Sequence, residues 1–486
     1  MNIVNDTYEK EGNSNNLTLK EIEYLINPFQ LFKNFYNLYK KSFILESLVG
    51  PRELSEMTVI GFDPELVVTC SPTKFNVFKH DKIIYKAEVK DPLLQLRQFL
   101  GNIKDYRFRY IGGAVGYISY DAIRFWEDLP LMDESKNTKG FDIMEFGIYR
   151  DGLLFNHKDK RGFYFCTNEN SRFDIVAEQL RKTEGGADAN PTELFAYSRP
   201  IPNIKKQDFI SMVKKSRKLL YDGDIFQVVL SKSLKFNVKG NILRIYESLR
   251  EVNPSPYMYF LSMNDRCIIG SSPEMLLRVT GDYIETFPIA GTRPVVRNEK
   301  TNQELQRDLL NDKKEIAEHT MLVDLARNDI GRICKYGSVV VSDLMNVKRF
   351  SHVQHIVSHV TGRLRDDCDS FEAIKSLFPA GTVTGAPKVR AMQIIDELEP
   401  DLRGPYAGAV GYFSFNGSAD FAIAIRSLFV KKEKAYIQSG AGIVIDSVPS
   451  REWTETEHKA NALLLAIKKA KINGKQKDQR TRQNKQ

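Results

Sequence analysis

The sequence lacks the marks of several protein classes. Its five cysteines are scattered and never occur in CxxC spacing (Cys70, Cys166, Cys267, Cys334 and Cys368). Dispersed cysteines, odd in number, argue against a disulfide framework and against a structural zinc site. No stretch approaches the run of about 20 apolar residues that a membrane span needs, and the first residues are too polar for a secretory signal. We therefore expect a cytoplasmic protein with no membrane partner.

The sequence also has little net charge for its length. Its 70 basic and 62 acidic residues leave a net charge of +8, much of it in the last stretch from Lys468 onward. A basic end on a balanced body is more often solvated and disordered than bound to nucleic acid. No RNA or DNA motif accompanies it, so we expect no nucleic-acid partner.

The 486 residues are enough for two or three ordinary domains or one large one. Helical spacing occurs at residues 27–39, 207–221 and 313–333, and short strand-like stretches at 42–47, 58–62, 66–69, 74–78, 83–85, 112–118, 141–149, 153–156, 162–167 and 225–230. Strands mixed with helices, without regular βαβ alternation, favour an α+β fold. We predict a flexible N-terminus (1–20), an N-terminal region (21–182), a linker (183–203), a second region (204–470) and a disordered basic tail (471–486).

A glycine- and threonine-rich stretch, FPAGTVTGAPKVR at 378–390, precedes a helical pattern that begins near Pro387. Glycines allow close backbone approach, and a helix N-terminus presents unpaired N–H donors to an anion. The spacing of Lys388 after Gly385 does not fit a Walker A loop. A carboxylate ligand would suit these donors, although a glycine-rich turn that only starts a helix is an equally good interpretation.

Two pairs of carboxylates occur at helical i, i+3 spacing. Glu315 and Glu318 lie in the helix predicted over 313–333, and Glu452 and Glu455 follow a helix start at 446–450. Residues three apart share a helix face. If both helices face one cleft, four carboxylates suit a hard cation such as Mg²⁺, whereas each pair taken alone is more often a solvated helix face.

Three histidines offer a competing metal site. His352, His355 and His359 could share a helix face, but the surrounding residues alternate as in a strand and are rich in β-branched types. We favour the strand, with hydrogen-bonded histidines, and leave His355 open as an acid or base.

Five strings together carry a family resemblance. They are PIAGTRP (288–294), DLARND (324–329), GAPK (385–388), QSGAG (438–442) and the helix at 452–459. In this order they resemble the chorismate-utilising enzymes, and among these the large subunits (component I) of anthranilate synthases, over roughly residues 25–470. The resemblance implies two large antiparallel or mixed β-sheets packed as a sandwich with helices outside, and region 204–470 as the catalytic, chorismate-binding part.

The resemblance also implies the site. Glu318 and Glu455 match direct Mg²⁺ ligands, and Glu315 and Glu452 match residues that act through water. The matching substrate-binding positions are Gly291, Thr292, Tyr406, Arg426, Gly440, Ala441, Gly442 and Lys459. The matching catalytic positions are Glu274, His355, Gln227 and Thr382, with Glu274 as the acid for the leaving hydroxyl and His355 near the elimination chemistry.

Two positions separate subfamilies within this resemblance. Isochorismate and salicylate synthases carry a water-activating lysine where this chain has Gln227, and most aminodeoxychorismate synthases carry an adduct-forming lysine where it has Ala290. The resemblance therefore favours ammonia as nucleophile, amination at ring carbon 2 and pyruvate elimination to anthranilate. An aminodeoxychorismate synthase remains the nearest alternative.

The resemblance extends to regulation and partners. The residues that match a tryptophan feedback pocket are Ser47, Asn253, Pro254, Pro256, Tyr257 and Met258. No nucleophile-elbow cysteine with downstream His and Glu occurs, so the resemblance implies a separate glutamine amidotransferase subunit and a hetero-oligomer. A non-catalytic, tryptophan-sensing protein on the same fold is the alternative from another class.

Overall fold

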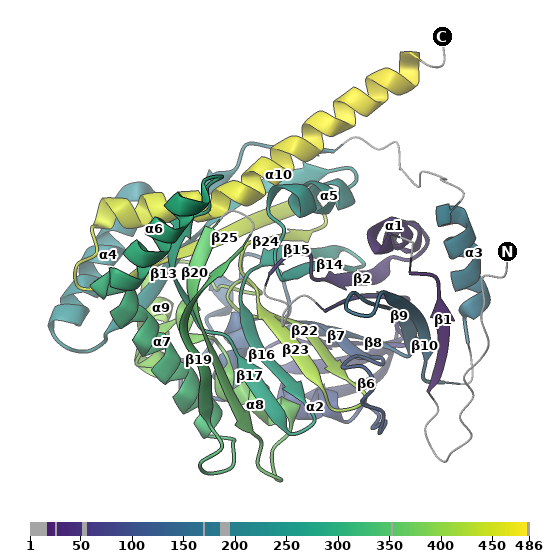
Figure 1. Ribbon diagram of the computed structural model, residues 1–486, viewed down its shortest axis with the longest axis horizontal. Coiled ribbons are helices and arrows are strands. Elements are labelled where there is room, and N and C mark those ends of the chain that lie inside the picture. Colours follow the sequence, from purple (N-terminus) through teal and green to yellow (C-terminus); the bar gives the residue numbers. More distant parts are fainter. Residues whose placement is uncertain are drawn as a thin grey trace.

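The computed structural model describes residues 17–24, 27–50, 56–168, 171–184, 195–350 and 353–483, with the side chains described only as far as 471. Two large β-sheets pack face to face, and helices cover their outer surfaces (Figure 1). Every pair of neighbouring strands recorded within these residues is antiparallel. The predicted α+β sandwich is confirmed.

The larger sheet has 13 strands in the described part of the chain. Its main path runs through β1 (Thr18–Ile22), β10 (Arg161–Cys166), β9 (Asp151–Asn156), β3 (Met57–Phe62), β2 (Lys41–Glu46), β14 (Tyr257–Met263), β15 (Arg266–Ser272), β24 (Ser427–Lys431), β25 (Lys434–Ile443), β13 (Gln227–Lys239) and β11 (Ala196–Tyr197). The short strands β12 (Ile201–Pro202) and β21 (Gly385–Ala386) also pair with β13.

The smaller sheet has 12 strands among the described residues. Its order is β18 (Ile289–Pro294), β20 (Val353–Arg363), β17 (Tyr283–Thr286), β16 (Met275–Thr280), β23 (Ala419–Ile423), β22 (Ala409–Ser414), β7 (Gly113–Ile118), β8 (Met144–Tyr149), β4 (Leu66–Cys70), β5 (Lys74–Lys79) and β6 (Lys82–Glu88), with β19 (Val340–Arg349) beside β20. The predicted strand around His355 is confirmed by β20.

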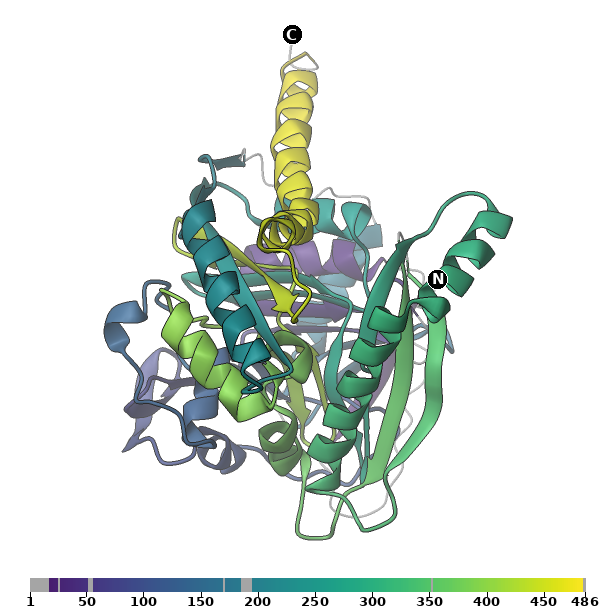
Figure 2. The same cartoon turned by 90° about the vertical axis from the view of Figure 1, so that its left-hand side faces the viewer.

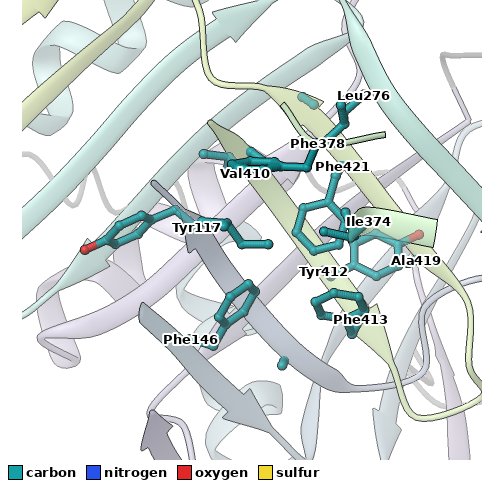
Figure 3. Packing of buried hydrophobic residues seen from close by; sticks show 14 of the residues in the cluster. Tyr117, Phe146, Leu276, Ile374, Phe378, Val410, Tyr412, Phe413, Ala419 and Phe421 are labelled. Carbon is teal, nitrogen blue, oxygen red and sulfur yellow. The ribbon is translucent and has the colours of Figure 1, made fainter. Parts of the chain in front are cut away.

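Alternation along the strands explains the layering. In β2, Phe43 belongs to the core between the sheets, whereas the next residue, Ile44, packs beneath the outer helices. Successive strand residues point to opposite faces, so a strand buried on both sides is apolar throughout. Figure 3 shows part of the central core, where Phe146, Phe413 and Phe421 pack closely.

The described residues form ten α-helices. They are α1 (Pro28–Leu38), α2 (Pro92–Arg97), α3 (Phe173–Glu184), α4 (Lys206–Tyr221), α5 (Leu243–Val252), α6 (Glu299–Asn311), α7 (Lys313–Gly331), α8 (Ser370–Leu377), α9 (Lys388–Leu398) and α10 (Pro449–Gln483). The helices α1, α4, α5, α9 and α10 pack on the larger sheet, and α6, α7 and α8 on the smaller one. Figure 2 shows α6 and α7 on one side of the molecule, with the long α10 above the body.

The two halves of the sequence are not separate domains. Strand β2 from the first half pairs with β14 from the second, and β7 pairs with β22. Of the predicted linker, 185–194 lie outside the described residues, and the part that follows adds β11 and β12 to the edge of β13. The predicted linker therefore does not separate two domains, because strands from both halves of the sequence pair within each sheet.

The C-terminal boundary also differs from the prediction. Helix α10 continues through Gln483 and so includes most of the tail predicted to be disordered. This stretch has no proline and is rich in lysine, glutamine and arginine, which favour helix. Of the N-terminus predicted to be flexible (1–20), residues 1–16 lie outside the described residues, whereas 18–20 belong to β1, because they pair with β10. No described helix is long and apolar enough to cross a membrane.

Candidate active site

Helix α7 positions the first carboxylate pair. Asp312 caps the helix, because its side chain accepts from the backbone N–H groups of Lys314 and Glu315. Arg293 approaches Glu315 to 3.8 Å but also binds Asp312, so it is shared between carboxylates. Burial raises the pKa of Glu315, and the negative charges of Glu318 and Asp312 raise it further. The pair is therefore only partly neutralised.

Helix α10 positions the second pair. Glu452 is buried, and burial raises its pKa, with Glu455 adding repulsion and Lys314 opposing it. The influence of Lys314 means that the beginning of α7 lies within electrostatic reach of the beginning of α10. Glu455 is partly exposed and pairs with Lys459 at 2.7 Å. The N-terminal ends of α7 and α10 are thus electrostatically coupled through Lys314 and Glu452.

The coordination shell itself is not assembled. Within the described residues, no three His, Cys, Asp or Glu side chains lie close enough together to hold a metal ion. The donors nevertheless have the right chemistry, because two carboxylate pairs with mutual repulsion are stabilised by a hard divalent cation. The residues present fit Mg²⁺ by charge and donor type.

Strands β13 and β25 place Gln227 and the glycine-rich segment next to α7. The side-chain nitrogen Nε2 of Gln227 lies 3.3 Å from Oε1 of Glu318. A Cβ atom at Gly442 would lie 2.5 Å from that same nitrogen, so a larger residue there would force the Gln227 amide to move. The buried Oε1 of Gln227 has no hydrogen-bond partner among the described residues.

Three side chains with polar tips gather around Gly440. A Cβ atom there would lie 3.0 Å from the hydroxyl oxygen of Tyr406. Lys459 donates to the Gly440 carbonyl at 3.0 Å, and Arg426 donates to the Lys459 carbonyl at 3.3 Å. Arg426 has a positive φ of 52°, a strained conformation that is uncommon outside glycine and often found at functional sites. Guanidinium, ammonium and phenol groups together suit a carboxylate.

His355 on β20 faces the turn of β18. Its Nδ1 lies 2.6 Å from the carbonyl oxygen of Gly291 and 3.2 Å from Oγ1 of Thr292. A carbonyl only accepts, so Nδ1 carries the proton and Nε2 keeps a free lone pair. Burial lowers the pKa of His355, and the charge of Arg426 lowers it further. The imidazole is therefore neutral at pH 7 and close to the Arg426 group.

Glu274 lies in a pocket of about 400 Å³ between β16, α7 and the glycine loop, with Thr382, Leu322 and Leu325 on its wall. Burial raises the pKa of Glu274 to about 7, although the Thr382 hydroxyl and the charge of Lys459 oppose the shift. The side-chain oxygen of Thr382 is itself buried and has no hydrogen-bond partner among the described residues. A carboxyl group with such a pKa can donate a proton near neutrality.

The glycine loop differs from the predicted anion site. A Cβ atom at Gly385 would lie 2.1 Å from the carbonyl oxygen of Gln227, so this glycine permits contact between two backbones. Lys388 pairs with Asp329 at 2.6 Å and is not free to bind an anion. Pro387 is the N-cap and not the first helical residue. The glycine loop thus pairs with β13. This contact accounts for the glycine without an anion at the start of the helix.

A second pocket, of about 500 Å³, lies between the two sheets. Ser47, Pro256, Tyr257 and Met258 of the predicted regulatory set line it, whereas Asn253 and Pro254 do not. Asn253 bonds instead to the Ser271 hydroxyl at 2.9 Å. The adjoining segment 51–55 lies outside the described residues.

Sequence analysis missed a buried ion pair between Arg403 and Glu399, 2.7 Å apart. The pair contacts the glycine loop and strand β13. The only sequence signal is the i, i+4 spacing of opposite charges, which gives no indication of burial.

Comparisons with known proteins show the family. The model of the chorismate binding enzyme family matches residues 42–465. Anthranilate synthase component 1 of Methanothermobacter marburgensis is 46% identical over 443 residues, covering 91% of this chain and 93% of that protein. The protein of the same name from Acetivibrio thermocellus is 42% identical over 466 residues, covering 91% and 93%. The chain therefore belongs to the chorismate-utilising enzyme family.

Solved structures agree as well. Anthranilate synthase component I from Streptococcus pneumoniae superposes with a TM-score of 0.74 at 36% identity, covering 84% of this chain and 92% of that chain. The menaquinone-specific isochorismate synthase from Escherichia coli gives a TM-score of 0.69 at 19% identity, covering 93% and 94%. The second likeness concerns the fold alone.

Proposed function

We propose that the chain is the large subunit of an anthranilate synthase, which aminates chorismate with ammonia and eliminates pyruvate to give anthranilate, the first committed step of tryptophan biosynthesis. The main support is the amide of Gln227, 3.3 Å from Glu318. An amide is neither a base nor an acid near neutral pH, so it cannot activate water. Ammonia, a nucleophile in its own right, needs no such base.

The enolpyruvyl carboxylate and the ring of the substrate are assigned to two different groups of residues. Tyr406, Arg426 and the backbone at 440–442 suit the enolpyruvyl carboxylate, with Lys459 adding positive charge. Gly291 and Thr292 are assigned to the ring. Arg426 is largely desolvated, and burial lowers its pKa, so an anionic ligand would restore favourable charge pairing.

Two groups are assigned to proton transfer. Glu274, with a pKa of about 7, donates its proton to the 4-hydroxyl as that group leaves as water, while the nitrogen of ammonia bonds to ring carbon 2. Thr382 orients this carboxyl. The Nδ1 of His355 binds the carbonyl oxygen of Gly291 at 2.6 Å, which leaves Nε2 free. This nitrogen is assigned to the elimination step, in which ring carbon 2 loses a proton and pyruvate departs.

Mg²⁺ is the proposed cofactor. Glu318 and Glu455 would hold it directly, and Glu315 and Glu452 through water. When bound, the ion supplies Lewis-acid withdrawal of charge through the ring carboxylate. The support from this chain is that burial, and then the charge of the neighbouring carboxylate in each pair, raises the pKa of both Glu315 and Glu452.

A partner subunit and a regulator complete the proposal. A glutamine amidotransferase subunit supplies ammonia in a cytoplasmic hetero-oligomer, and free ammonium replaces it in vitro. Tryptophan is the proposed feedback ligand of the pocket between the sheets, where Ser47 and Met258 lie beside an ion pair of Arg109 and Glu56 at 2.6 Å. Apolar walls with both charges suit an aromatic amino acid.

The experiment is product identification. The purified chain is mixed with chorismate, Mg²⁺ and ammonium, and the products are followed by fluorescence and mass spectrometry. Ortho-aminobenzoate with equimolar pyruvate supports the proposal. The 4-amino-4-deoxy product would favour an aminodeoxychorismate synthase, although Ala290 has no amine to form a ring adduct. Tryptophan binding without any chorismate turnover would favour a sensor.

A further inference from the structure

Arg403 is a fully buried arginine, with 1% of its surface exposed. Its Nε and NH2 nitrogens donate to the two carboxylate oxygens of Glu399 at 3.0 and 2.7 Å. The remaining hydrogen bonds go to backbone carbonyls, those of Val383 and Val229, both at 2.7 Å. The fixed fork of a guanidinium group can satisfy all four contacts at once, whereas an ammonium group cannot.

The carbonyls held by Arg403 belong to the segments that carry the proposed site. Val383 follows Thr382, which lines the same pocket as Glu274. Val229 lies opposite Gly442 in the ladder between β13 and β25 and two residues from Gln227. The backbone N–H of Val229 donates to the carbonyl of Thr384 at 2.8 Å, so the loop and the strand are also joined directly.

Glu399 also contacts strand β13. Its Oε1 accepts from both the backbone N–H and the hydroxyl of Ser231, each at 2.8 Å. Ser231 lies opposite Gly440 in the ladder. On the other side, the guanidinium carbon of Arg403 lies 5.8 Å from the centre of the Tyr406 ring. One ion pair therefore contacts the glycine loop and strand β13, whose ladder partner β25 carries the glycine-rich segment, and it lies beside the Tyr406 ring.

We propose that Arg403 and Glu399 are positioning residues for the active site. They hold Thr382, the backbone at 440–442 and Tyr406 in one arrangement without touching substrate. A buried ion pair contributes little net stability compared with apolar residues of the same shape, so stability alone gives no reason for its four directed contacts. The inference rests on the function proposed for this site.

Three variants of graded severity test the proposal. Arg403→Lys keeps the charge and loses the fork, Glu399→Gln keeps the shape and loses the charge, and Ser231→Ala removes one hydroxyl. Arg365→Lys, at an exposed arginine paired with Asp367, is the matched control. Folding is followed by circular dichroism, and kcat and KM for chorismate are measured on folded protein with ammonium as nucleophile.

We expect Arg403→Lys and Glu399→Gln to lower kcat/KM for chorismate by about 10- to 100-fold, because small misplacements of site groups cost this much. Ser231→Ala, the mildest change and the one that certainly preserves packing, lowers it severalfold, and the control leaves it unchanged. If the folded variants lose only thermal stability, with kcat and KM within twofold of wild type, the pair is merely structural and the proposal is wrong. Failure of wild type to form anthranilate would instead overturn the proposed function.

Discussion

The candidate active site and the pocket between the sheets treat their charges differently. In the pocket, each buried carboxylate has a close cation. Glu46 accepts from Arg250 at 2.7 Å, and Asp420 accepts from Arg278 at 2.9 Å. In the active site, Glu315 and Glu452 lie beside other carboxylates, and their pKa values are raised.

This difference indicates what each region can bind. The carboxylate pairs on α7 and α10 would favour the proposed cation, whereas Arg426 would favour an anion. The pocket is already neutral and gains most from apolar contact and a few hydrogen bonds. Variants in each region test whether the two differ in this way.

The largest effects are expected at the two carboxyl groups Glu318 and Glu274. Glu318→Gln removes a charge where the proposed cation is held, so anthranilate formation should fall by about 10²- to 10³-fold, comparable with the loss of a transition-state stabilising group. Fluorescence assays across a Mg²⁺ titration measure it. Glu304→Gln on α6 is the control, and equal activity of Glu318→Gln and wild type would break the contrast.

Glu274→Gln should lower kcat by about 10²- to 10⁴-fold, because it removes a general acid. In the wild type, the acid form is lost as pH rises through the pKa of about 7, and the rate should then fall about tenfold for each further pH unit. The free energy of unfolding should also decrease as pH rises from the usual carboxyl range through this pKa, since the folded state must accept a buried charge. A pH profile of Glu274→Gln identical to that of wild type would contradict this assignment.

Gln227→Lys should lower anthranilate formation by about 10- to 100-fold, the usual effect of changing a partner of a metal ligand. The new ammonium would lie beside Glu318 and compete with a cation. Separation of products by chromatography measures the loss and would also detect any water addition. An unchanged rate would show that the amide has no part in the site.

A smaller effect is expected in the pocket. Ser47→Ala removes a hydrogen bond of 2.6 Å to the Pro256 carbonyl, worth about 1 kcal/mol, so inhibition by tryptophan should weaken about fivefold. Basal kcat should not change. Calorimetric titration and inhibition curves measure it, with Ser338→Ala, at a serine that does not line this pocket, as control. Loss of basal activity together with inhibition would show that the two regions are not independent.

The smallest effect is expected at the C-terminus. Deletion of residues 472–486 should leave kcat, KM and retention on DNA unchanged, because the proposed site lies wholly before it. Gradient elution from DNA at varied salt measures retention. A marked loss of salt-dependent retention would restore nucleic-acid binding as an alternative.

Sequence periodicity predicted most elements, including α1, α4, α7 and the strand carrying His355, because local apolar patterns reflect burial on one or two faces. It could not predict that β2 pairs with β14, since pairing across the sandwich depends on contacts far apart in sequence. The sequence also did not show why residue 385 is a glycine, because close approach of another backbone and close approach of a ligand both favour glycine.

The candidate site was predictable in part. Motif spacing indicated the carboxylate pairs, and the electrostatic coupling of Lys314 to Glu452 is consistent with their convergence. The roles of the individual site residues stay predictions. Arg403 could not be identified, because a buried arginine is recognised only from the carbonyls around it.

The most direct test of the central claim is Mn²⁺ binding, followed by electron paramagnetic resonance in the presence of chorismate. Glu318→Gln on α7 and Glu455→Gln on α10 are compared with the exposed control Glu457→Gln. If one cation is held between the two helices, each of the first two variants should weaken binding by about 10- to 100-fold, and the control should bind as wild type does. Binding that survives in either Glu318→Gln or Glu455→Gln would contradict a shared site.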